Sequence, residues 1–343
     1  MIDILQKAPE IWDLFTLKEE YNSALQDQFG RFPYYASQNR NIFEPVVSNY
    51  LVNQGFRLSY PDNKPFAVCL THDIDTVYTS ILSKGLSTIR NLKKGNFRQA
   101  FNSILQMRSK KLPLCNFSAI MDLEEKYDAK STFFFMAENP GERDYTYNIT
   151  DFEPEIRTIN NRGWEVGLHG GHTSYLDSGE MIRKKKRLEQ ITRKPVIGYR
   201  NHYLRFKVPQ TWEYLSQAGF MYDSTLGYAD CAGFRNGMCH PFRPYNLEKK
   251  RGIEIIEIPL IVMDCTLDET YMRLDEPSKW EFVKSLIDRV AACHGVFTVL
   301  WHNTYMTEKN FQFYEKLLKY CHEKNAWLTT GREISSVSHY EER

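Results

Sequence analysis

Short apolar segments alternate with longer amphipathic segments along most of the chain from Phe66 onward. This alternation is typical of a largely parallel sheet whose strands are joined by crossover helices. Seven or eight strands are expected, the number that closes a barrel. The apolar segments predict strands near residues 66–71, 131–136, 164–168, 196–199, 219–222, 253–260, 296–301 and 326–329, and the amphipathic segments predict helices near 116–127, 151–161, 179–193, 208–217, 277–293 and 309–324.

Two segments do not follow this alternation. Residues 1–62 are polar and aromatic and carry no chemical motif, so we expect an N-terminal extension that packs on a barrel formed by residues 63–343. Residues 76–115 form an insertion between the first two predicted strands, much longer than a crossover connection requires.

The insertion is basic. Segment 82–111 contains Lys and Arg but no acidic residue, and its apolar residues recur at steps of three and four, which predicts basic amphipathic helices. Such helices favour peripheral contact with an anionic membrane or a lipid-linked glycan. A helical flap that packs on the barrel and exposes its basic face to solvent is the alternative.

The composition is that of a globular protein, with 42% hydrophobic and 25% charged residues. Lys plus Arg number 44 against 43 for Asp plus Glu, so no overall charge attracts the chain to nucleic acid. Seven cysteines without a CxxC pair argue against a disulfide framework and a thiolate zinc site. Because no long apolar segment or leader is evident, we expect a cytoplasmic protein with reduced thiols.

Reactive side chains follow the predicted strands at the points where the strands end. The carboxyl ends of barrel strands meet at one rim, where the active sites of such folds lie. We therefore expect these side chains to gather. They are Asp73 and Asp75 after the first strand, His169 and His172 after the third, Arg200 and His202 after the fourth, Asp223 after the fifth, Asp264 after the sixth and His302 after the seventh.

The first and third strand ends indicate a metal site. Asp73 and Asp75 share one face if the strand continues, and two anions this close favour a cation between them. His169 and His172, beside two glycines, can bind one ion through neutral imidazole nitrogens. One carboxylate with two histidines is an open site for zinc or a related divalent metal. An Asp-rich turn is the alternative interpretation of the first motif.

The other strand ends suit supporting roles. A buried Arg200 needs a carboxylate partner, which Asp223 or Asp230 could supply, either for function or as a structural ion pair. His302 suits a general acid because the pKa of histidine lies near neutrality. Arg235 belongs to a loop rich in aromatic residues and arginine, at residues 233–245, that could form a substrate wall.

Together these segments resemble the polysaccharide deacetylases, the carbohydrate esterase family 4 type of metal-dependent hydrolase, over about residues 64–335. The resemblance implies a distorted (β/α)₇ barrel. Thr71-His72-Asp73 followed by Asp75 is similar to the family's first motif, Thr-Phe-Asp-Asp, with one residue inserted. This match implies that Asp73 is the catalytic base and Asp75 a metal ligand.

The second and third motifs leave the remaining metal ligand open. The segment from His169 is similar to His-Ser/Thr-x-x-His, but its second histidine, His172, comes three residues on instead of four. Arg200-Asn201-His202-Tyr203 aligns with Arg-Pro-Pro-Tyr, and His202 replaces a proline close to the metal. His172 and His202 are therefore equal candidates for the third ligand.

The same alignment implies further roles. Arg200 orients the base, and the backbone N–H of Tyr203 stabilises the oxyanion. Asp223, as a carboxylate partner for Arg200, is counted with the catalytic residues. Leu300-Trp301-His302 matches the Leu-x-His motif, which makes His302 the acid. Trp301 and Arg235 are counted with the substrate-binding residues.

The resemblance implies a deacetylase that acts on an acetylated sugar of a surface polysaccharide or of its precursor. Its cofactor is a divalent metal, with zinc expected first and cobalt, nickel or manganese as alternatives. Two other functions stay open on the same fold. One is hydrolysis of a non-sugar amide or cyclic C–N bond; the other is binding of a glycan or membrane without catalysis.

Overall fold

The computed structural model describes residues 1–77, 115–268 and 270–337 of the chain. Within these residues a nine-stranded sheet, parallel at every pairing, forms the centre of the molecule. The insertion predicted at 76–115, and with it segment 82–111, lies almost entirely outside the described residues. The strands are β1 (Ala67–Ile74), β2 (Thr132–Met136), β3 (Glu165–Gly170), β4 (Gly198–Asn201), β5 (Tyr222–Asp223), β8 (Ile256–Glu257), β9 (Val262–Met263), β10 (Val296–Leu300) and β11 (Trp327–Thr329).

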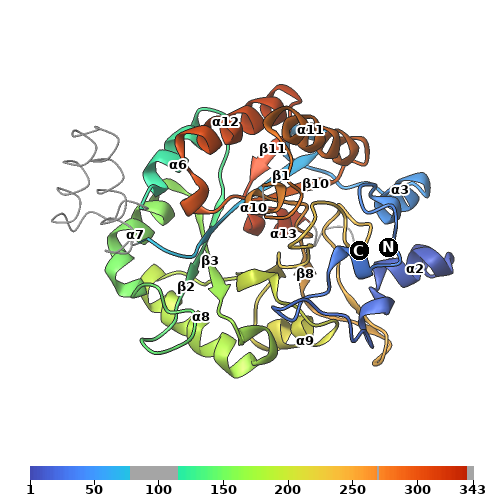
Figure 1. Cartoon of the computed structure of the whole chain (residues 1–343), viewed down its shortest axis with the longest axis horizontal. Helices are drawn as coiled ribbons and strands as arrows, with labels where there is room; N and C mark the ends of the chain where they lie inside the picture. The colour runs from blue at the N-terminus through green and yellow to red at the C-terminus, as the bar shows by residue number, and fades with distance from the viewer. Residues whose placement is uncertain (78–114, 269, 338–343) are drawn as a thin grey trace.

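The sheet curls into a half-barrel surrounded by helices, so the predicted distorted (β/α) barrel fold is confirmed, although β8 and β9 at the two ends of the sheet do not pair with each other. Its strand order is β8-β5-β4-β3-β2-β1-β10-β9, with β11 also paired to β1. Helices surround the strands on the outside of the ring (Figure 1). They are α6 (Phe117–Glu125), α7 (Glu153–Arg162), α8 (Ser178–Thr192), α9 (Gln210–Gln217), α11 (Glu276–Ala292) and α12 (Glu308–Glu323). Two shorter helices, α10 (Asp264–Leu267) and α13 (Gly331–Val337), appear within the ring in this view.

The long β1 begins with four apolar residues and is wholly buried, and it pairs with β2 along one edge and with β10 along the other. Its carboxyl end therefore lies at the rim between those of β2 and β10. The strands next to it, β2 and β10, carry similar buried apolar runs.

The strand predicted at 253–260 is wrong in its extent. These residues contain only one strand, the short β8. The hairpin strands β6 (Tyr245–Asn246) and β7 (Arg251–Gly252) precede it, and β9 follows as a separate strand. Pro259 ends the extended pairing because it lacks a backbone N–H. The strand that delivers Asp264 to the rim is β9, which the sequence did not indicate as an independent element.

The N-terminal segment packs against one side of the barrel, where α2 (Pro9–Phe15) and α3 (Val46–Asn53) follow the short α1 (Ile2–Leu5) (Figure 1). The ring of Phe15 lies 5.1 Å from that of Phe242, centroid to centroid. Buried Glu20 forms an ion pair of 2.5 Å with buried Arg235. Apolar burial and this ion pair fix the segment to the loop that follows β5.

Within the described residues, no helix combines the length and the apolar character that crossing a lipid bilayer demands.

Candidate metal centre

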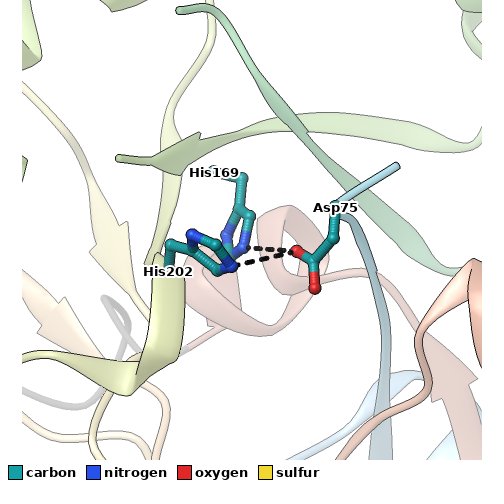
Figure 2. A group of neighbouring side chains, drawn as sticks. All are labelled: Asp75, His169 and His202. Atoms are coloured by element: carbon teal, nitrogen blue, oxygen red, sulfur yellow. Dashed lines mark ion pairs between the residues drawn. The ribbon is translucent and has the colours of Figure 1, made fainter. Parts of the chain in front are cut away.

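Three side chains from neighbouring strand ends point toward one another at the rim (Figure 2). Asp75 follows β1, His169 belongs to β3, and His202 begins the short 3₁₀ turn after β4. Parallel pairing of β3 with β4 places His169 opposite Arg200. This register brings the next turn, and with it His202, to the same side of the rim.

The three side chains offer ligand atoms that all lie within 4.8 Å of one another. His169 Nε2 is 3.2 Å from Asp75 Oδ1, and His202 Nε2 is 3.7 Å from the same oxygen. Neither Asp75 Oδ1 nor His169 Nε2 has a hydrogen-bond partner, although both atoms are buried. Buried polar atoms are rarely left without a partner, so this pair points to a ligand.

The outer nitrogens of both imidazoles are already engaged. His169 Nδ1 lies 3.0 Å from the carbonyl oxygen of Arg200, and His202 Nδ1 lies 2.9 Å from Asp144 Oδ2. Since both partners can only accept, each Nδ1 carries the proton and donates it. Each Nε2 then presents a lone pair toward Asp75, the arrangement of metal-bound histidines held by an outer carboxylate or carbonyl. The donor set fits a divalent metal.

Electrostatics favour ionised Asp75. Burial alone would raise the pKa of this carboxyl group, but the adjacent His169, His302 and His202 outweigh that effect and hold the pKa below its ordinary value. For His169, burial opposes protonation, whereas Asp73 and Asp75 raise the pKa of its imidazole above the ordinary value. The carboxylates thus create a field at the rim that attracts a cation.

Asp73 lies deeper than Asp75 and is buried. Its Oδ2 is 3.7 Å from His169 Nε2, and its Oδ1 has no hydrogen-bond partner. A free carboxylate oxygen next to the candidate ligands can accept a proton from a bound water molecule.

Arg200 is fully buried beneath the rim. Its Nη2 donates to Thr71 Oγ1 at 2.9 Å and to Ser224 Oγ at 3.2 Å, and its guanidinium lies 5.2 Å from the centre of the Phe134 ring. Within the described residues it forms no ion pair with Asp223 or Asp230, the partners considered from the sequence. Two hydroxyl groups and an aromatic face contact this cation instead, and its Nε and Nη1 have no hydrogen-bond partner.

His302 approaches Asp75 from the opposite side, with its Nε2 3.7 Å from Asp75 Oδ2. Its Nδ1 lies 2.7 Å from Asp264 Oδ1, and its backbone N–H donates to Asp264 Oδ2 at 2.5 Å. Burial disfavours the charged imidazole, but Asp264, Asp75 and Asp73 outweigh it and raise the pKa of His302 to about 10. A protonated His302 at neutral pH can donate a proton.

A cavity of about 200 Å³ opens at this group. Its walls come from β1, β3, β9 and β10, the turn after β4 and the N-terminal segment. The lining residues are Arg31, Asp73, Asp75, His169, His202, Tyr203, Leu204, Met263, Cys265, Tyr271, Leu300, His302, Thr304 and Tyr305.

Four residues singled out in the sequence lie elsewhere. His172 is outside the ligand group, with its ring centre 5.8 Å from that of Tyr203. Asp223 is buried opposite Glu257 on β8. Arg235 is bound to Glu20 instead of forming a wall of the cavity. The indole ring of Trp301 stacks on Phe313 and does not line the cavity.

Two parts of the site carried no sequence signal. Asp144 comes from the loop between β2 and α7, and Arg31 comes from the N-terminal segment that we expected only to pack. Both residues lie far along the chain from the motifs they contact. No local pattern distinguishes them from ordinary surface charges.

The family model for polysaccharide deacetylases matches residues 111–222. A solved structure from Mycobacterium smegmatis, assigned as a polysaccharide deacetylase, shares 19% identity over 82% of this chain and 92% of that chain, with a TM-score of 0.55. Peptidoglycan deacetylase PdaC from Bacillus subtilis shares 14% identity, covering 82% and 95% of the two chains, with a TM-score of 0.40. No curated protein sequence matches the chain.

Proposed function

We propose that this chain, whose residues 111–222 belong to the polysaccharide deacetylase family, removes acetyl groups from an acetylated sugar of a surface polysaccharide or of its precursor. Members of that family are hydrolases of amide or ester bonds. The observation that carries the proposal is the group formed by Asp75, His169 and His202, in which unpartnered ligand atoms converge at the barrel rim.

The metal is a divalent cation, zinc first and cobalt, nickel or manganese otherwise, held by Asp75, His169 and His202. When bound, such an ion lowers the pKa of a coordinated water molecule toward about 7 and polarises a carbonyl group. Arg200 O and Asp144 hold the two imidazoles in the orientation that this binding requires.

Asp73 acts as the base. Its buried, unpartnered Oδ1 accepts a proton from the attacking water. The backbone N–H of Tyr203, which lines the cavity, donates to the oxygen of the acetyl carbonyl as negative charge develops there. Arg200 lies beneath the rim and supports the position of the strand that carries the base, through its bond to Thr71.

His302 acts as the acid. Asp264 orients its ring and keeps it protonated, so it can donate a proton from Nε2 to the departing amine or alkoxide. General acid and general base contributions are each worth roughly 10²–10⁴ in rate. The site therefore contains the groups needed for both proton transfers.

The test is release of acetate by the purified chain from a panel of N-acetylated and O-acetylated sugars, beside cyclic amides. We expect acetate release that stops on chelation and returns with zinc, cobalt, nickel or manganese. Asp73→Asn should retain the metal but lose at least about 10² in kcat. Turnover of cyclic amides alone, or an active Asp73→Asn variant, would refute the proposal.

A further inference from the structure

We propose that the loop Asp27–Arg31 of the N-terminal segment is a positioning element of the metal centre, and that Phe29 and Arg31 hold His202 in its metal-binding position. The inference rests on the proposed function only in that it takes the centre to bind a divalent metal. Neither residue belongs to a sequence motif, and both lie outside residues 111–222, the segment that the family model matches.

The turn that carries His202 has an unfavourable backbone. Tyr203 has a φ of 60° and Leu204 a φ of 55°, left-handed values that side chains with a Cβ rarely adopt. Two consecutive residues in this region persist only where surrounding contacts hold them. Asn201 Nδ2 supplies one such contact, at 2.9 Å from the carbonyl oxygen of His202.

Phe29 supplies an aromatic contact from outside the barrel. Its ring stacks on that of Tyr203, with centroids 5.0 Å apart and planes inclined by 12°. The Tyr203 ring in turn stacks on the imidazole of His202, at 3.8 Å and 25°. The ligand imidazole is thus one end of a three-ring stack whose other end is Phe29. Tyr203 is 38% exposed, and besides Phe29 and His202 its ring meets the edge-on imidazole of His172, at 5.8 Å.

Arg31 supplies a polar contact to the same turn. Its Nη1 donates to the carbonyl oxygen of Tyr203 at 3.0 Å, and Arg31 itself is buried at the cavity wall. This bond fixes the peptide that follows the left-handed Tyr203.

The loop is itself rigid enough to act as a support. Asp27 Oδ1 accepts from the backbone N–H groups of Phe29, at 2.8 Å, and Arg31, at 3.0 Å. Its Oδ2 accepts from Arg31 Nε at 2.7 Å. A single carboxylate therefore fixes both the backbone of Phe29 and the guanidinium of Arg31, and Gly30 between them takes a φ of +72° that suits glycine. The loop meets the His202 turn as a preformed unit.

The experiment compares Phe29→Ala and Arg31→Ala with the unsubstituted full chain. Zinc affinity is measured by competition with a chromophoric chelator, and kcat and KM are measured on the acetylated sugar. We expect zinc to bind at least about tenfold more weakly, the effect usual for residues that orient a metal ligand. The conservative Phe29→Tyr should restore affinity, and Arg31→Lys should restore part of it, because one ammonium can still reach Tyr203 O.

Matched controls come from the same segment. Tyr35→Ala removes an aromatic ring that is 63% exposed, and Arg40→Ala removes an exposed guanidinium. Both should leave zinc affinity and kcat unchanged. If Phe29→Ala fails to fold by circular dichroism, Phe29→Leu keeps the apolar contact but removes the stack, and should still weaken zinc binding.

The outcomes separate this inference from the proposed function. Zinc affinity within twofold of the unsubstituted chain in folded Phe29→Leu and Arg31→Ala would overturn the inference, even if acetate is released. Weakened zinc binding in both variants supports it, even if no acetylated sugar is a substrate. Equal weakening in Tyr35→Ala and Arg40→Ala would also overturn it, because the effect would then be general destabilisation.

Discussion

His169 Nε2 lies 3.2 Å from Asp75 Oδ1, and no hydrogen bond joins the two atoms. The Nδ1 proton of His169 is donated to the carbonyl oxygen of Arg200, so Nε2 of the neutral ring would direct a lone pair at a carboxylate oxygen. Two acceptors at this distance repel one another. A divalent cation held between them would remove that repulsion by binding both atoms.

The metal-ligand assignment predicts different effects for the two candidate histidines. Asp75→Ala and His202→Ala should lose most bound zinc, because each removes a ligand from the group within 4.8 Å. His172→Ala should retain zinc, because His172 lies outside this group. Metal content of the purified variants by mass spectrometry checks the prediction. A His172→Ala protein without metal, beside a fully loaded His202→Ala protein, contradicts it.

Asp264→Asn should lower the rate and shift its pH dependence. Asp264 orients His302 through Nδ1, so we expect kcat to fall by about 10²–10⁴. Burial lowers the pKa of His302, but the nearby carboxylates outweigh burial and raise this pKa to about 10. Asp264 makes the largest contribution among these carboxylates. Without that carboxylate the ring loses its proton at lower pH, so the alkaline limb of kcat/KM should move to lower pH.

A pH profile of kcat/KM from pH 6 to 10 measures this shift. Asp268→Asn is the control, because Asp268 contacts Lys279 and not His302. An alkaline limb that stays in place or moves upward in Asp264→Asn contradicts the assignment of His302 as the acid.

Glu257 should make stability depend on pH. Burial, and then the neighbouring Asp223, raise the pKa of Glu257 well above its ordinary value. The folded state therefore keeps a proton that the unfolded state releases, and the free energy of unfolding falls as pH rises from about 4.5 toward the raised pKa. Glu257→Gln cannot ionise, so this slope should become flatter.

Urea unfolding of both proteins at several pH values above 4.5 measures the slope. At low pH we also expect Glu257→Gln to lower the free energy of unfolding by about 1 kcal/mol. The two carboxyl oxygens accept hydrogen bonds from Trp212 Nε1 and from the backbone N–H of Leu226, and the amide NH₂ group cannot accept either of them. Glu254→Gln is the control, since that side chain is 77% exposed. An unchanged slope in Glu257→Gln contradicts the prediction.

Glu124 should be important for stability. Its carboxylate is fully buried and receives hydrogen bonds from Trp164 Nε1 at 2.5 Å and Tyr314 Oη at 2.7 Å, with His72 Nε2 at 2.9 Å. Glu124→Ala leaves these groups buried without partners, so we expect a loss of about 3–5 kcal/mol. Glu125→Ala on the exposed face of α6 should cost far less. Thermal or urea unfolding compares the two, and equal losses contradict this role.

The architecture and the reactive strand ends could be predicted from the sequence. Apolar runs and their spacing are local properties, so they located the central strands and placed Asp75, His169, His202 and His302 where strands end. Parallel strands that close into a barrel bring their carboxyl ends together whatever the loops do. For that reason a rim with carboxylates and imidazoles followed from the pattern alone.

Which of these side chains contact one another depends on the packing of distant segments. His172 and His202 were equal in the sequence, but the strand register and the left-handed turn at Tyr203 place only His202 beside Asp75. Arg235 does not line the cavity because it pairs with Glu20, which lies 215 residues earlier in the chain. The contacts of Asp144 and Arg31 with the site likewise join distant segments. Such pairings depend on how loops pack, and a local pattern of residues does not encode them.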